Sequence, residues 1–152
     1  MLRLDPVDRR LLSLLQRNGR ASYASLGSVV GLSAPATKRR VDRLRASGAI
    51  KMFTIMMAPE ALGWTTEAYI ELFCRNDTTP KDIVAIMNKY PEVLTACTVT
   101  GDADAVLHVV AVDVRHLERV VELVSAEPSV LRTRSAIVLS RLLSRPEGLA
   151  TH

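Results

Sequence analysis

The sequence lacks the cysteine and histidine content that disulfide-rich and zinc-binding proteins need. Its two cysteines, Cys74 and Cys97, are too few for a disulfide framework, and no Cys/His spacing suits zinc. The three histidines are scattered, and we expect His108, which lies inside an apolar strand pattern, to be a packing residue with a satisfied ring rather than a catalytic base. The sequence therefore predicts no metal site and no cofactor.

Signatures of enzymes and of membrane proteins are also missing. There is no glycine-rich phosphate loop and no Gly-x-Ser-x-Gly motif. Asp102 and Asp104 lie two residues apart on a predicted turn, a spacing that fixes no acid–base geometry. No apolar run approaches the roughly 20 residues that span a bilayer, and residues 1–6 do not resemble a signal peptide. We expect a cytoplasmic protein without catalytic residues.

Positive charge is concentrated in the N-terminal third of the chain. Residues 1–51 hold 11 Lys and Arg against three Asp, whereas residues 52–152 hold 9 basic and 13 acidic residues. This asymmetry predicts a polyanionic partner for one end only. A membrane surface is the rival to nucleic acid, but the basic segment has no large aromatic or leucine-rich face to insert into lipid.

Residues 22–48 predict two helices that meet at the corner Gly31-Leu32-Ser33. Ser22 is a suitable N-cap for a helix that begins at Tyr23, and Gly31 suits a helix C-terminus, where a positive φ is common. Ser33 can cap the second helix, with Pro35 in its first turn. This arrangement is a helix-turn-helix, which places its second helix in the DNA major groove.

The second helix is amphipathic. Thr37, Val41 and Leu44 recur at helical spacing and form its buried side, while the opposite side is basic. Arg40 lies on the flank of the buried stripe, where a phosphate or an internal carboxylate suits it better than a base edge. A solvated basic face is the alternative interpretation of such a charge run. The residues expected to contact DNA are Ser22, Ser33, Pro35, Lys38, Arg39, Arg40 and Arg43.

The rest of the chain predicts a second, α+β domain. Asp5 can cap a first helix, so that three helices fill residues 6–47, and a strand at 50–58 and a connection at 59–64 follow. The later elements are a strand at 67–75, a helix at 80–90, strands at 93–100 and 105–112, a helix at 114–126 and a strand at 130–143. This βαββαβ order is that of a ferredoxin-like α/β sandwich. Its first and second strands are not neighbours, so Cys74 and Cys97 would lie too far apart to bridge.

We therefore expect a winged, three-helix helix-turn-helix domain at residues 1–50. A strand and hinge linker at 51–64 joins it to a second domain at 65–152, which the family resemblance given next implies to be an effector-binding and oligomerisation domain. The N-terminal sequence resembles that of the Lrp/AsnC family, the feast/famine regulators. The resemblance lies in Leu4-Asp5, Asp8-Arg9, Leu15-Gln16, Gly19-Arg20, Ser22, Gly31-Leu32-Ser33, Arg40-Val41, Arg43-Leu44, Gly48 and Ile50.

The resemblance implies a transcriptional regulator that binds double-stranded DNA and responds to a small molecule, often an amino acid. It also implies homodimers that form through the sheets of the second domain and commonly assemble to octamers. The family's effector turn carries aromatic residues at two positions where this chain has Ala103 and Ala105. That departure leaves either a wider pocket for a bulkier amino acid or a lost ligand.

The predicted effector residues are Thr100, Gly101, Asp102, Ala103, Asp104, Thr133 and Ser135. In this prediction Thr100 offers a hydroxyl, the amides around Gly101 approach a carboxylate, and Asp102 or Asp104 takes an ammonium group. A plain hairpin turn is the competing interpretation. The whole chain could then be an architectural DNA-binding protein whose C-terminal domain serves only for assembly.

Overall fold

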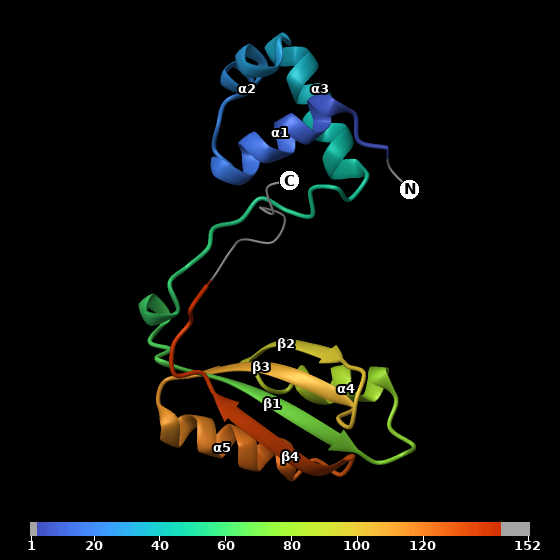
Figure 1. Cartoon of the computed structure of the whole chain (residues 1–152), viewed down its shortest axis with the longest axis vertical. Helices are drawn as coiled ribbons and strands as arrows, with labels where there is room; N and C mark the ends of the chain where they lie inside the picture. Colours follow the sequence, from blue (N-terminus) through green and yellow to red (C-terminus); the bar gives the residue numbers. More distant parts are fainter. Residues whose placement is uncertain (1–2, 144–152) are drawn as a thin grey trace. The chain divides into compact units, whose positions relative to one another are not determined.

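The structure, a computed structural model, describes residues 3–143 and divides into two compact units. The described residues up to Met56 form a helical unit, and Met57–Leu143 form an α/β unit (Figure 1). No helix among the described residues is long and apolar enough to cross a membrane.

Three helices build the first unit, and each begins at a side-chain cap. They are α1 (Pro6–Arg17), α2 (Tyr23–Val30) and α3 (Ala34–Ala46). Asp5, Ser22 and Ser33 each accept a hydrogen bond from a backbone N–H in the first turn, which satisfies an otherwise free donor. Their apolar sides meet in one core, formed by Leu11, Leu15, Leu26 and Val41. The three predicted helices and their caps are confirmed.

A four-stranded antiparallel sheet forms the second unit, and its order is β2-β3-β1-β4 (Figure 1). The elements are the short 3₁₀ helix η1 (Pro59–Leu62), β1 (Thr66–Cys74), α4 (Pro80–Met87), β2 (Val93–Thr98), β3 (Ala105–Ala111), α5 (Val114–Ser125) and β4 (Val130–Ile137). β3 separates β1 from β2, so Cys74 and Cys97 stay free as predicted. The predicted ferredoxin-like topology is confirmed.

The two faces of this sheet differ. Ile70, Leu72 and Leu107 point to the side that α4 and α5 cover, and they are fully buried. Tyr69 alternates with them and is 41% exposed on the opposite side, which no element among the described residues covers. That uncovered side is called the open sheet face below.

Two strand predictions were wrong: the predicted strand at 50–58 does not form, and the last strand is shorter than predicted. Residues 51–58 form no strand and no wing follows α3 within the described residues, because no described segment pairs with them and a strand requires a ladder partner. The last strand ends at Ile137 rather than at residue 143. Its partner β1 begins at Thr66, and the Val138 N–H makes the final bond, to the Glu67 carbonyl.

Candidate functional site

The corner between α2 and α3 has the geometry of a helix-turn-helix. Gly31 ends α2 with a φ of 71°, in the left-handed region that glycine adopts without a steric cost. The Leu32 N–H then donates to the Gly27 carbonyl at 2.9 Å, and the Ser33 hydroxyl accepts the Ala36 N–H at 3.4 Å. These bonds turn the chain and start α3, so local sequence alone sets the corner.

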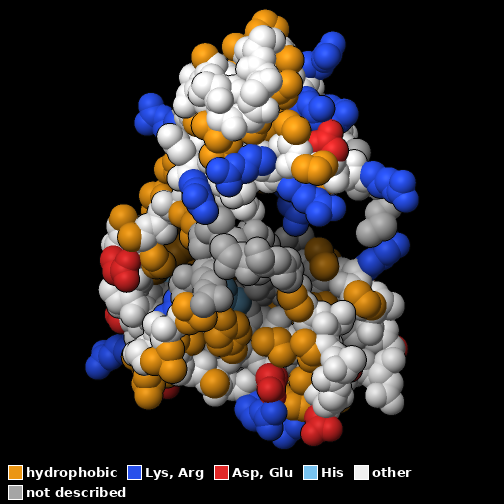
Figure 2. All heavy atoms as spheres, turned by 45° about the horizontal axis from the view of Figure 1, so that its top comes forward, with side chains coloured by type: hydrophobic (Ala, Val, Ile, Leu, Met, Phe, Trp, Pro, Cys, Tyr) orange, Lys and Arg blue, Asp and Glu red, His pale blue; other side chains and the backbone are white. Residues whose placement is uncertain are grey.

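The corner exposes one side of α3 and buries the other. Thr37, Val41 and Leu44 are fully buried, as predicted. Six of the predicted DNA contacts are exposed, namely Ser22, Ser33, Pro35, Lys38, Arg39 and Arg43. On the face shown in Figure 2, Lys and Arg side chains stand out over the helical unit and acidic ones are sparse. The exposed side of α3 is therefore a basic surface.

Several of these cations already have carboxylate partners within the unit. Lys38 Nζ lies 2.6 Å from Asp42 on the next turn of α3. Arg40 donates to Asp5 at 2.5 Å and to Asp8 at 2.9 Å, and Arg43 donates to Asp8 at 2.6 Å. Arg40 thus lies against internal carboxylates, one of the two placements that the sequence left open.

Sequence reasoning missed Asp5 and Asp8 as partners of α3. The two residues form a reciprocal capping box at the start of α1, and each carboxylate then reaches an arginine of α3. The hydrogen bond from Arg40, followed by the one from the Asp8 backbone, lowers the pKa of Asp5. Two acids at capping-box spacing were the available signal, but which cations they meet depends on how the helices pack.

The predicted effector turn lies between β2 and β3. Gly101 has a φ of 123°, and Thr100, Gly101 and Asp102 are exposed. The Asp104 carboxylate accepts a hydrogen bond from the Cys74 N–H at 2.7 Å. The backbone N–H of Asp104 donates to the Leu72 carbonyl at 2.9 Å. Asp104 therefore ties the turn to β1, although both Asp102 and Asp104 are exposed.

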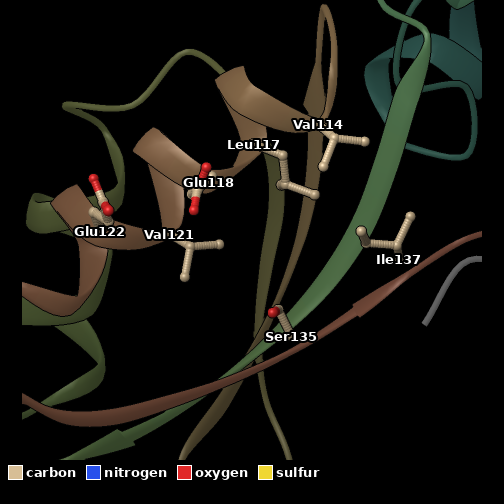
Figure 3. A pocket seen from close by; sticks show the side chains of 7 residues that line it. All are labelled: Val114, Leu117, Glu118, Val121, Glu122, Ser135 and Ile137. Carbon is tan, nitrogen blue, oxygen red and sulfur yellow. The ribbon is translucent and has the colours of Figure 1, made fainter.

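The two predicted effector residues of β4 lie elsewhere in the unit. Thr133 shares a hydrogen bond of 2.8 Å with Ser125 of α5. Ser135 and Ile137 line a groove of about 420 Å³ between β4 and α5, whose other lining residues are Val114, Leu117, Glu118, Val121 and Glu122 (Figure 3). β1 lies between β4 and the Asp104 end of the turn, and Thr133 and Ser135 are engaged on the α5 side of β4. A single chain therefore does not bring all seven predicted residues into one cluster.

On the open sheet face, charged and histidine side chains lie against the aromatic residues Tyr69 and Phe73, and sequence reasoning did not single out these neighbours. The Arg132 guanidinium lies 3.8 Å from the centre of the Phe73 ring, and Arg134 pairs with Glu71 at 2.5 Å. The ring of Tyr69 stacks on His108, whose Nε2 lies 2.6 Å from Glu67. His108 thus has the satisfied ring that was predicted.

Together, the basic helix-turn-helix and the separate α/β unit define a regulator class with one DNA-binding domain and one ligand-binding domain. Residues 4–45 match the AsnC-type helix-turn-helix domain, and residues 67–147 match the Lrp/AsnC ligand binding domain. The chain belongs to the Lrp/AsnC family of transcriptional regulators. It is a transcriptional regulator and not an enzyme.

Relatives and solved structures agree with this membership over nearly the whole chain. The HTH-type transcriptional regulator Rv2324 of Mycobacterium tuberculosis is 48% identical over 145 residues, which are 95% of this chain and 98% of the relative. A feast or famine regulatory protein of the same organism, Rv3291c in complex with L-methionine, is 32% identical with a TM-score of 0.86, over 93% of this chain and 96% of that one. The complex of the regulator NMB0573 of Neisseria meningitidis with L-Met is 27% identical with a TM-score of 0.87, over 93% and 94%.

Proposed function

We propose that the chain binds specific duplex DNA through α3 and that an amino acid, bound by its second domain, modulates this regulation. The observation that carries the DNA part is the exposed side of α3, which a glycine corner presents while the opposite side of the helix is fully buried. An α-helix held in this way fits the major groove.

Lys38, Arg39 and Arg43 are the charged contacts in this proposal, with Ser33 and Pro35 at the corner and Ser22 at the start of α2. Among the described residues, Arg39 has no carboxylate within 4.0 Å, so it is available to a base edge, where a bidentate contact to guanine is the commonest specific one. Lys38 can exchange Asp42 for a phosphate because the two side chains are 60% and 42% exposed, so the pair is accessible to solvent.

The DNA proposal predicts that Lys38→Ala/Arg39→Ala weakens duplex binding. Each lost phosphate contact should reduce the salt dependence of log affinity by about 0.9, and loss of a base contact should cost about 1–3 kcal/mol and relax the preferred sequence. Fluorescence anisotropy on selected and scrambled duplexes measures both effects. Arg115→Ala on α5 is the matched control, because it removes an exposed charge from the other unit. Unchanged affinity in the double variant would refute this placement of the contacts.

We infer that the ligand is an amino acid at the Thr100–Asp104 turn, near a junction between subunits. The two L-methionine complexes among the similar structures support this class of ligand. Thr100, the amides around Gly101 and the carboxylate of Asp102 are exposed together, and Asp104 has one carboxylate oxygen on the Cys74 amide. Ala103 and Ala105 are buried, so their small side chains add no space on the exposed side of the turn.

Calorimetry across the common amino acids, L-methionine included, tests the ligand. We expect binding to the wild type and weaker binding to Asp102→Asn, with Asp104→Asn as a second variant whose folding is checked by circular dichroism because that carboxylate also holds β1. Asp77→Asn is the control, an exposed loop carboxylate outside the turn. If no amino acid binds at millimolar concentration, the turn is only a hairpin turn.

The alternative is an architectural DNA-binding protein whose second domain only assembles the chain. It shares the helix-turn-helix and differs in predicting no response to amino acids. Footprinting on genomic DNA with and without amino acids separates the two, because a ligand shifts protection only if it favours one assembly over another. In either case we propose an even-numbered homo-oligomer, a dimer that assembles further to an octamer.

A further inference from the structure

The N-terminus of α1 and the flank of α3 are joined by a four-residue ionic cluster, here named the Asp5/Asp8 clamp. It consists of Asp5, Asp8, Arg40 and Arg43. A single nitrogen of Arg40 donates to Asp5 at 2.5 Å and to Asp8 at 2.9 Å, and one nitrogen of Arg43 reaches both oxygens of Asp8 at 2.6 and 2.8 Å. The clamp links residues that are at least 32 positions apart in the sequence.

Burial distinguishes the members of the clamp. The Asp8 side chain is 1% exposed, and a buried carboxylate is strongly destabilising unless it is paired. Arg40 is 28% exposed and touches both carboxylates, whereas Arg43 is 53% exposed and touches one. Arg40 is therefore bound to two carboxylates of the unit and mostly shielded from solvent. Arg43 is bound to Asp8, with about half of its side-chain surface exposed to solvent.

The clamp is part of a wider pattern in the helical unit. Residues 1–51 contain only three acids, Asp5, Asp8 and Asp42, and all three contact cations of α3. A helix that bound DNA by charge alone would gain affinity from leaving these cations free. Phosphate contacts are independent of sequence, so each released cation strengthens binding to every duplex alike.

We propose that Asp5 and Asp8 are positioning residues that withhold Arg40 from the DNA backbone and so raise the ratio of specific to non-specific binding. This inference rests on the proposed function, because it concerns how α3 discriminates among duplexes. Arg39 reads base edges, Arg43 contacts phosphate while tethered, and Arg40 contributes to the internal clamp rather than to the DNA surface.

The test compares salt dependence on selected and scrambled duplexes for four proteins: wild type, Arg40→Gln, Asp5→Asn/Asp8→Asn, and the triple variant that combines these changes. Asparagine keeps the N-cap and the shape of both side chains while it removes their charge. We expect Arg40→Gln alone to leave the slope of log affinity against log salt unchanged. The double variant should bind scrambled DNA more tightly, with a slope steeper by about 0.9, and the triple variant should lose that gain.

Each result has a definite meaning. A slope shallower by about 0.9 in Arg40→Gln would show that Arg40 already contacts phosphate, and it overturns the proposal even if the double variant fails to fold. A folded double variant with wild-type slope and wild-type discrimination overturns it as well. A wild-type chain that binds no duplex overturns the proposed function itself, which is a separate and recognisable outcome.

Discussion

At the scale of single residues, Gly27 shows how little space the corner leaves. A Cβ atom at this position would lie 2.4 Å from the carbonyl oxygen of Leu32 and 2.8 Å from the hydroxyl of Thr37. The Leu32 carbonyl belongs to the backbone of the corner, and the Thr37 hydroxyl donates to the Ser33 carbonyl at 3.0 Å. Neither atom can move without loss of the geometry that presents α3.

Gly27→Ala should therefore destabilise the helical unit by about 1–3 kcal/mol, the usual cost of overpacking a closed site, although alanine is the better helix former. Thermal or urea unfolding followed by circular dichroism measures the change. Ser28→Ala, an exposed position on the same helix, is the control and should stay within about 0.5 kcal/mol of wild type. A fully stable Gly27→Ala would mean that the corner relaxes.

Residue roles that depend on neighbours in sequence were predictable, and those that depend on packing were not. Ser22, Gly31 and Ser33 act on groups within a few positions, so capping rules identified them. Asp8 meets Arg43 across 35 positions, and only the packing of α1 against α3 brings the two together. Whether the predicted DNA and effector residues bind their partners stays a prediction.

At the scale of elements, Tyr90 ties the segment that follows α4 to the segment that follows α5. Its hydroxyl donates to Glu127 at 2.6 Å, and Lys89 pairs with the same carboxylate at 2.9 Å. Burial, and then the hydrogen bond to the charged Glu127, raises the pKa of Tyr90 to about 12.

The raised pKa predicts a loss of stability at high pH. Between the ordinary value of 10 and about 12, the folded state keeps a proton that the unfolded state has lost, so stability falls as the pH rises through that window. Ultraviolet titration should show a tyrosine transition near pH 12 that Tyr90→Phe removes. A transition that survives in the variant would belong to another tyrosine.

Elements with internal periodicity were predictable from the sequence, and the ends of strands were not. The buried residues of α5 recur at helical spacing, and β3 is a short apolar run. Each pattern lies within one segment, and both elements formed where expected. Residues 51–58 have strand-forming side chains, yet Met52, Ile55 and Met56 are exposed and the segment has no ladder partner among the described residues. A strand forms only where a second segment supplies its hydrogen-bond partners, and the sequence of one segment does not show whether such a partner exists.

At the scale of the whole molecule, the open sheet face predicts self-association. Tyr69 and Phe73 lie on it beside the Glu71–Arg134 ion pair, so apolar and paired polar groups share one uncovered surface. Light scattering should give twice 16.7 kDa or a larger even multiple. Two recognition helices would then read half-sites spaced by multiples of a DNA turn.

Tyr69→Glu should weaken this association, because it places a charge on the apolar part of the face. Val84→Glu is the matched control, since Val84 is an exposed apolar residue of α4, which packs against the other side of the sheet. A wild-type monomer at micromolar concentration, or equal effects of the two changes, would rule out the open face as the interface.

The strand order β2-β3-β1-β4 has a consequence for how the chain is made. β1 is the first strand to leave the ribosome, but its partner β4 ends only at Ile137. The helical unit, by contrast, finds its core partners within residues 7–50. During synthesis α1–α3 can therefore pack before β4, the last strand of the sheet, has been made. The DNA-binding half is complete well before the half whose open sheet face we propose as the subunit interface, so we expect assembly to follow only after β4 has been made.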